Sequence, residues 1–304
     1  MSGFFDAALV ESIVRALIPV LFAALGALLC DRAGVFNIAL EGQLLIGCFG
    51  AVAGSYFTGS AVVGVIAAVL AASVFSLILS YGSVTRKAEP IVLGVAMNIL
   101  AVGITSFLID AVFHVRGVFQ DPAIAGLHHF AIPGLVRIPW IGPALFNLTI
   151  LGYLGLLLVP ATSIVLFRTP LGMRLRGVGE RPLAAETLGV SPASYQYGAV
   201  TASGVLCGLA GAQLALGNVV QFAENMSAGR GWIAVVAVML AKDKPYATLG
   251  AALLFGSTEA IGFRLQGEGL AVQITDAAPY VVTLIALLFA ARSFRRQRAA
   301  ATVA

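Results

Sequence analysis

The chain has 304 residues, of which 60% are hydrophobic and only 11% are charged. A soluble domain carries about 25% charged residues, so this composition excludes a water-soluble globular protein and indicates an integral membrane protein. The formal net charge of +4 does not indicate nucleic-acid binding, because basic residues in a multi-span membrane protein serve first to set its topology.

Apolar runs long enough to cross a bilayer, which takes about 20 residues each, recur along the chain. They fall near 12–30, 35–57, 61–81, 91–113, 146–167, 195–216, 246–265 and 275–291. A shorter run from Trp232 to Ala241 covers only about 15 Å at 1.5 Å per residue, so it must stop partway or borrow preceding residues. We therefore expect an all-α transmembrane bundle of about nine spans (eight to ten) in one domain over residues 1–304.

The charged residues predict the orientation of the spans. The N-terminal stretch lacks a basic region and an Ala-x-Ala site, so the first run is expected to be a retained span rather than a signal peptide. When successive connections are placed on alternate sides, most basic residues fall on one side. These are Arg32, Arg86, Lys87, Arg168, Arg174, Arg176, Arg181, Lys242, Lys244, Arg292, Arg295, Arg296 and Arg298. The positive-inside rule makes that side cytoplasmic, with the N-terminus outside and the C-terminus inside.

The longest external connection covers residues 114–144. It holds all three histidines of the chain, His114, His128 and His129. No carboxylate or cysteine stands at ligand spacing from them, so we expect no metal site. We expect instead a docking surface for an external partner.

Polar side chains inside the apolar runs are the candidates for a solute pathway. A carboxylate such as Glu41 is costly at that depth and normally faces the bundle interior or a water-filled cavity. If 35–57 is one helix, Asn37 lies one turn before Glu41 on the same face. Such groups either line a pathway or hold helices together by hydrogen bonds, and both roles remain open. The same two roles apply to Gln43, Asn98, Gln213 and Glu259.

The second half of the chain carries Gly229-Arg230-Gly231-Trp232 directly before the short apolar run. Unusually short, glycine-interrupted segments in both halves point to a translocation site between two inverted repeats, formed by discontinuous helices. The segments 34–57 and 229–265 fit this description. Arg230 joins the candidate pathway residues, and Trp232 or Phe222 is available to stack on a ligand.

Residues 168–194 form the longest polar interruption on the expected cytoplasmic side. Within it, residues 180–189 predict a short helix, because Pro182 suits the first turn and Gly189 suits the position after the last turn. A short isolated helix is marginal in water, so this one needs a surface on which to dock. The alternative is a solvated loop whose arginines only fix the topology. The residues assigned to docking are Gly179, Glu180, Pro182, Ala184, Ala185, Glu186, Leu188 and Gly189.

Three stretches together resemble one family. The order Gly-x-Gly-Glu-x-Pro-x-Ala-Ala-Glu-x-x-Gly at 177–189 resembles the coupling loop of bacterial ABC importer permeases of the nucleoside and simple-sugar type. The Gly-Val-x-Asn-x-x-x-Glu-Gly run at 34–42 and the Gly-Arg-Gly run at 229–231 are similar to other signatures of that family. It belongs with the ribose and branched-chain amino acid permeases. The resemblance extends from about Gly34 to Tyr280.

The resemblance implies an inner-membrane permease subunit that translocates a small polar solute by alternating access, a nucleoside first and a simple sugar next. It implies three partners and no cofactor: a cytoplasmic ATP-binding subunit, an extracytoplasmic binding protein, and a second related permease. This chain resembles the shorter of two non-identical permeases. The chain contains no phosphate-binding Gly-x-x-x-x-Gly-Lys-Ser/Thr motif, so ATP hydrolysis is expected on another chain.

Two other classes of function remain as alternatives. A secondary transporter driven by an ion gradient could carry protons on Glu41 and Glu259. A membrane enzyme or scaffold would require a catalytic constellation that the motifs do not supply. Dependence of uptake on a separate ATPase distinguishes these classes.

Overall fold

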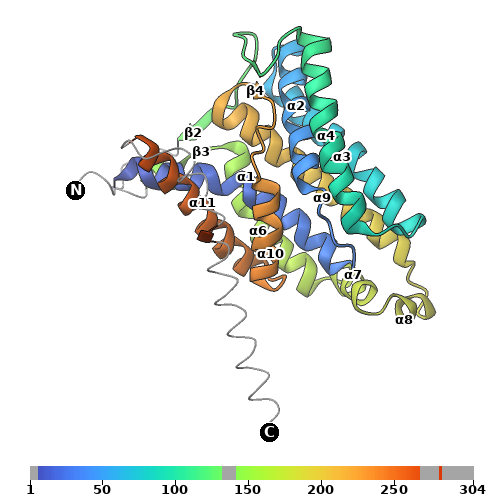
Figure 1. Cartoon of the computed structure of the whole chain (residues 1–304). Helices are drawn as coiled ribbons and strands as arrows, with labels where there is room; N and C mark the ends of the chain where they lie inside the picture. Colours follow the sequence, from blue (N-terminus) through green and yellow to red (C-terminus); the bar gives the residue numbers. More distant parts are fainter. Residues whose placement is uncertain (1–5, 132–141, 268–280, 283–304) are drawn as a thin grey trace.

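The computed structural model describes residues 6–131, 142–267 and 281–282. The described part is almost entirely helical, with two short two-stranded sheets (Figure 1). The α-helices are α1 (Ala7–Arg32), α2 (Leu40–Thr58), α3 (Ala61–Leu79), α4 (Pro90–Phe113), α5 (Gly142–Phe146), α6 (Ile150–Arg168), α7 (Pro170–Glu180), α8 (Pro182–Thr187), α9 (Pro192–Ala212), α10 (Arg230–Ala241) and α11 (Pro245–Gly267). Two π-helical segments, η1 (Ser80–Thr85) and η3 (Gln213–Val219), extend α3 and α9.

Helix α1 is the centre of the bundle. Its side chains are apolar around most of the circumference, which is typical of a helix buried on all sides. Leu21, Phe22, Leu25 and Leu28 are fully buried. Helices α9, α10, α11 and α6 pack around it. Helix α3, by contrast, exposes an apolar stripe at Val62, Ile66, Leu70 and Val74, as expected for a surface that meets lipid or another apolar partner.

Five helices among the described residues are long and apolar enough to cross a membrane, namely Ala7–Arg32, Ala61–Thr85, Pro90–Phe113, Ile150–Arg168 and Pro192–Val219. They correspond to five of the expected spans and confirm an all-α membrane bundle. Helices α2 and α11 occupy two further expected runs, and α10 is the short one. The expected span at 275–291 lies mainly outside the described residues.

The prediction that 35–57 forms one helix is wrong at its start. Gly34 has a left-handed backbone with φ of 78°, and residues 35–38 are not helical. The Asn37 side chain accepts a hydrogen bond from the Ala39 backbone at 2.9 Å, a local turn that competes with the helix. Asn37 therefore precedes α2 instead of sharing a helical face with Glu41.

Small residues allow the helices to approach closely, as their spacing in the sequence indicates. A Cβ on Gly208 would lie 2.6 Å from the Val69 Cα, and one on Gly54 would lie 2.6 Å from the Ala67 Cβ. These contacts join α9 and α2 to α3. The glycines thus set the helix spacing in this half of the bundle.

The expected short helix of the loop at 168–194 is present as α8, with Pro182 at its start and a left-handed Gly189 just after it. A second helix, α7, precedes it. Thr169 caps α7 by accepting a hydrogen bond from the Gly172 backbone at 3.3 Å, and Pro170 occupies the first turn. Both helices lie at one end of the bundle (Figure 1).

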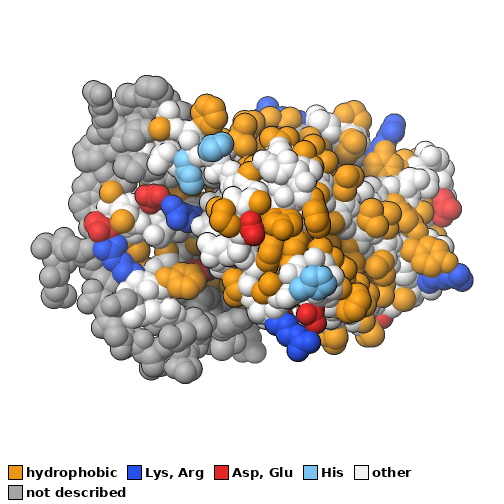
Figure 2. Space-filling model, turned by 90° about the horizontal axis from the view of Figure 1, so that it is seen from above, with side chains coloured by type: hydrophobic (Ala, Val, Ile, Leu, Met, Phe, Trp, Pro, Cys, Tyr) orange, Lys and Arg blue, Asp and Glu red, His pale blue; other side chains and the backbone are white. Residues whose placement is uncertain are grey.

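The connection after α4 forms parts of both small sheets. Strand β1 (Val118–Phe119) pairs antiparallel with β4 (Phe222–Ala223), and β2 (His129–Ala131) pairs antiparallel with β3 (Asn147–Thr149). Figure 2 looks down on this end and shows histidines on the surface among many apolar side chains. Residues 132–141 of the expected external connection lie outside the described part.

Candidate solute cleft

The short helix α10 begins inside the bundle, where Glu41 of α2 caps it. Gly229 takes a left-handed backbone with φ of 84° and ends the preceding loop. The Glu41 carboxylate accepts hydrogen bonds from the Gly229 backbone at 2.8 Å and from the Gly231 backbone at 2.7 Å. A carboxylate is favoured there because the unpaired N–H groups of a helix N-terminus carry partial positive charge.

Glycine is required at position 231 by this contact. A Cβ on Gly231 would lie 2.5 Å from the Glu41 Cα and 2.8 Å from Oε2 of its carboxylate. The Gly-Arg-Gly signature therefore supplies a left-handed turn at Gly229 and room for Glu41 at Gly231.

Asn98 of α4 holds the start of α2 in place. Its Oδ1 accepts a hydrogen bond from the Gly42 backbone at 2.8 Å, and its Nδ2 donates to the Ile38 carbonyl at 3.0 Å. Both groups belong to the junction of the non-helical segment 35–38 and α2. Asn98 thus fixes the backbone on either side of Glu41.

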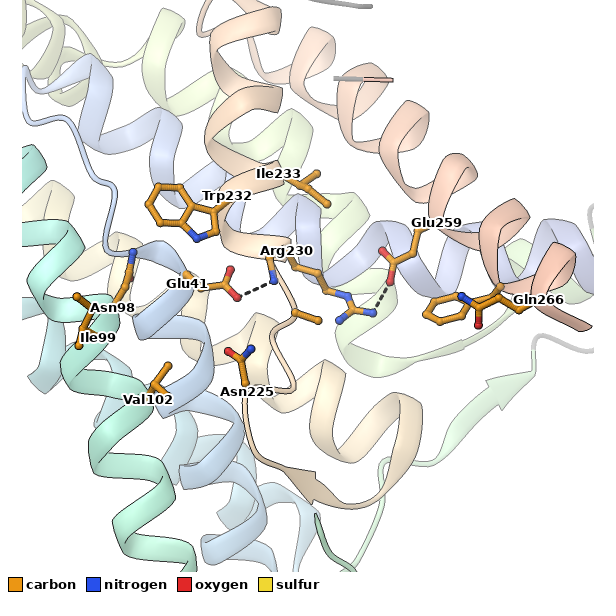
Figure 3. Close-up of a pocket in the computed structure, with 13 residues that line it drawn as sticks. Glu41, Asn98, Ile99, Val102, Asn225, Arg230, Trp232, Ile233, Glu259 and Gln266 are labelled. Carbon is orange, nitrogen blue, oxygen red and sulfur yellow. Dashed lines mark hydrogen bonds and ion pairs between the residues drawn. The ribbon is translucent and has the colours of Figure 1, made fainter. Parts of the chain in front are cut away.

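Arg230 and Glu259 form a largely buried ion pair between the start of α10 and α11 (Figure 3). The exposed fractions of their side chains are 13% and 12%. Arg230 also donates from Nη1 to the backbone carbonyls of Met226 and Ser227. The loop before α10 is therefore tied to α11 through one guanidinium group.

These groups surround a cleft of about 720 Å³. Figure 3 shows Glu41, Asn98, Arg230, Trp232 and Glu259 arranged around it. Glu41 and Asn98 are buried at its floor, with exposed fractions of 7% and 8%, whereas Trp232 is 40% exposed. The cleft thus combines a fixed polar floor with an accessible aromatic side chain.

The other four candidate pathway residues lie elsewhere. Asn37 donates to the Ser203 hydroxyl at 3.0 Å and lies near Gln43, which it contacts at 3.4 Å. Gln213 accepts from the Thr149 hydroxyl and donates to Asn218. Phe222 is fully buried and packs edge-to-face on Phe49, so its ring faces a neighbouring side chain.

The lining residues that the sequence did not single out include Ile99, Val102, Asn225, Phe263 and Gln266. Asn225 stands four residues before Gly229 in a left-handed backbone, and an Asn just ahead of a glycine signature is the signal that could have identified it. The three apolar residues give no such signal, because they read as ordinary parts of α4 and α11.

At the end of the bundle that holds α7 and α8, two leucines are exposed, Leu183 within α8 and Leu188 directly after it. Leu183 and Leu188 are 78% and 84% exposed, respectively, and Glu180, Pro182, Ala184 and Glu186 are exposed around them. Ala185 is buried within the chain, so it does not belong to the outer face of α8. Gly179 packs on the turn between α1 and α2.

A bundle of apolar helices with a polar cleft at the start of a short interior helix has the architecture of a solute-transporting membrane protein. A comparison with protein families shows which family of transport proteins this is. Residues 9–291 match the family described as branched-chain amino acid transport system / permease component, and the chain belongs to it. It is the permease subunit of an ABC importer, a multi-pass inner-membrane protein whose ATPase lies on a separate chain.

Three relatives are similar over most of their length. The chain is 34% identical to the guanosine ABC transporter permease protein NupQ of Bacillus subtilis strain 168, covering 88% of this chain and 87% of that protein. It is 33% identical to the putative glucose ABC transporter permease protein TsgC13 of Haloferax volcanii, covering 94% and 92%. It is 32% identical to the nucleoside ABC transporter permease protein NupC of Lactococcus lactis, covering 88% and 87%.

Proposed function

We propose that this permease imports a neutral nucleoside and that the solute passes through the cleft at the start of α10. The observation that carries the proposal is the Glu41 cap. A free helix N-terminus in a transporter binds an anionic group of the solute, such as a carboxylate. Here the N–H groups of Gly229 and Gly231 are already bonded to Glu41, so that place is not free for an anionic solute.

The remaining groups of the cleft suit a nucleoside. Trp232 offers an aromatic face on which a nucleobase can stack, and Asn225 and Gln266 bring amide groups to the same cleft. Arg230 is paired with Glu259, which leaves the cleft without a strong excess of either charge. Two of the relatives are named for guanosine or nucleoside and one for glucose, so a simple sugar is the second candidate.

We propose that a second, longer permease of the same family completes the pathway. Ile99 of α4 and Phe263 of α11 line the cleft and are 70% and 57% exposed, respectively. An apolar rim of this kind is costly in water and suits a face covered by another helical subunit. The resemblance to the shorter member of a permease pair supports a heterodimer.

The proposed topology has nine spans in one permease domain, with the N-terminus outside, the C-terminus inside, and two inverted repeats in which α2 and α10 are the interrupted helices. The loop at 168–194 then faces the ATP-binding subunit, and α8 docks there as a coupling helix. The connection at 114–144 faces the extracytoplasmic binding protein. Support comes from the basic residues, including Lys242 and Lys244 beyond α10. A single cysteine at Ser194 is expected to resist an impermeant thiol reagent in intact cells, and one at Ala123 is expected to react.

Uptake by the assembled complex tests the function. The experiment measures guanosine uptake in a strain that lacks its own nucleoside importers, with and without the ATP-binding subunit, in competition with unlabelled nucleosides and sugars. The proposal predicts uptake that requires the ATPase and is inhibited by nucleosides. Uptake that persists without the ATPase and collapses with a protonophore would instead support a secondary transporter. Inhibition by sugars alone would exclude the nucleoside assignment.

A further inference from the structure

The turn between α1 and α2 lies directly against the cytoplasmic loop. A Cβ on Gly179 would lie 3.0 Å from the Gly34 backbone nitrogen and would overlap the Arg32 carbonyl. A Cβ on Gly34, whose φ is 78°, would in turn lie 3.1 Å from the Gly179 Cα. The end of α7 and the end of α1 therefore touch backbone to backbone, and a displacement of one pushes on the other.

The side chain of Arg32 reaches from this turn to the residues that follow the C-terminal end of α10. Its Nε and Nη2 donate to the Asp243 carbonyl at 3.2 and 2.8 Å. Lys242 and Asp243 both have left-handed backbones, with φ of 51° and 52°. Consecutive left-handed residues other than glycine are costly, at about 1–2 kcal/mol each, so contacts from the rest of the structure must hold this turn.

Helix α10 connects that turn to the cleft. Its 12 residues span about 18 Å, and a single helix of this length moves as one rigid element. Its N-terminal end carries Arg230 and Gly231, which contact Glu259 and Glu41, respectively. A shift at Asp243 is therefore delivered to the cleft along the helix axis.

A second contact ties Arg32 to the same loop. The Arg32 guanidinium lies 5.6 Å from the centre of the Phe167 ring, and the Arg176 guanidinium of α7 lies 5.0 Å from it. Phe167 stands near the end of α6, just before the loop. Arg32 thus contacts the loop through an aromatic ring as well as through its own backbone.

We propose that Arg32 is the positioning residue that transmits movement of the cytoplasmic loop to α10 and thereby to the cleft. The inference rests on the coupling role proposed for α7 and α8, and it adds the route by which that movement travels inside the permease. Arginine suits the position because one guanidinium can donate two hydrogen bonds to the Asp243 carbonyl while stacking on Phe167.

The test compares Arg32→Gln with the wild type in the complete complex, reconstituted in proteoliposomes with its ATP-binding subunit, partner permease and binding protein. It measures the number of guanosine molecules imported per ATP hydrolysed. Arg86→Gln is the matched control. Arg86 also stacks on an aromatic ring, that of Tyr81, and donates a hydrogen bond to its hydroxyl, but it follows η1, which packs on α3, α4 and α9. We expect the import ratio of Arg32→Gln to fall about fivefold, with ATP hydrolysis continuing, and that of Arg86→Gln to match the wild type.

A second readout reports on the cleft itself. A cysteine at Asn225, with the three native cysteines replaced, is expected to change its labelling rate when ATP is added to the wild-type complex. In the Arg32→Gln background this change should disappear. An unchanged import ratio, or a preserved response of the cysteine, would overturn the proposal.

If Arg32→Gln fails to assemble, the proposal is tested on Arg32→Lys by the same two measurements, the import ratio and the response of the cysteine at position 225. Lysine keeps the charge but makes one of the two hydrogen bonds, so an intermediate ratio supports the route and a wild-type ratio contradicts it. A failure of the proposed function is recognised separately. It would appear in the wild-type complex as no guanosine uptake, or as a Leu188→Asp variant that couples normally.

Discussion

The carboxylate of Glu41 bonds to the backbone of Gly231, 190 residues further along the chain. This contact joins the starts of α2 and α10, each of which follows a non-helical segment. One acidic side chain therefore satisfies the N-terminus of α10 and places Arg230 and Trp232 around the cleft. Of the two roles expected for Glu41, hydrogen bonding between helices is present in the structure, and pathway lining stays a prediction.

Replacing Gly231 with alanine should disturb this junction. The added methyl group would overlap the Glu41 backbone and carboxylate, which costs about 1–3 kcal/mol of stability in a packed core. We expect a lower midpoint of thermal unfolding in detergent and loss of uptake. Gly250→Ala is the matched control, because among the described residues nothing outside its own stretch of helix lies within 4 Å of a Cβ at that position. Equal unfolding midpoints for the two variants would contradict the close contact.

The Glu41 variants separate charge from shape. Glu41→Leu leaves the N–H groups of Gly229 and Gly231 without their acceptor, which costs about 1–3 kcal/mol for the buried one at Gly231, so less complex should assemble. Glu41→Gln keeps one acceptor oxygen and should be intermediate in assembly. Uptake per assembled complex then reports on the pathway. A solute-facing role predicts an altered preference among nucleosides in the Gln variant, and a purely capping role predicts an unchanged one.

A charge on the outer face of α8 should uncouple the transporter without unfolding it. Leu188→Asp alters a side chain that is 84% exposed, so we expect normal abundance in the membrane, lost uptake and weaker association with the ATP-binding subunit. Ala185→Asp is a poorer test, since Ala185 is buried and the variant would disturb α8 itself. Ser194→Asp adds the same charge at an exposed position outside α8 and should transport normally. Wild-type uptake by Leu188→Asp would remove the support for docking at this face.

The turn after α10 should make stability depend on pH. Burial, together with a hydrogen bond and the charge of Asp31, raises the pKa of Asp243 to about 7, although Arg32 opposes the shift. Between the ordinary pKa of an aspartate carboxyl, 3.8, and about 7 the folded protein holds more protons than the unfolded chain, so stability falls as pH rises through this window. The unfolding midpoint of the wild type should drop from pH 5 to pH 8 more than that of Asp243→Asn, which cannot ionise. Parallel pH profiles for the two proteins would contradict the raised pKa.

Much of the fold follows from composition and spacing, because the bilayer restricts a spanning chain to helices of a set length. The short α8 was predictable from Pro182 and Gly189. Helix α7 was missed although its signal is present, since Thr169 followed by Pro170 is a typical helix start. The break before α2 was missed because Gly34 and Asn37 are surrounded by apolar residues that match a continuous span.

The candidate site was predictable in part, for a different reason. Glu41 and Arg230 stand out because a charged group inside a span is costly and needs a partner. Which partner each one takes depends on how α2, α10 and α11 pack, and no local pattern in the sequence contains that information. The same limit applies to Phe222 and Trp232. Both are aromatic residues near the glycine signature, yet only Trp232 lines the cleft.

The most direct measurement is guanosine uptake per assembled complex in a Trp232→Leu variant, with Trp232→Phe as the control that keeps an aromatic ring. Stacking of a base on an aromatic side chain contributes about 1–3 kcal/mol, so the Leu variant should lose about tenfold in uptake at low guanosine concentration. The Phe variant should retain most of the activity. If the Leu variant assembles normally and imports guanosine at the wild-type rate, the solute does not meet Trp232 and the cleft at the start of α10 is not the nucleoside pathway.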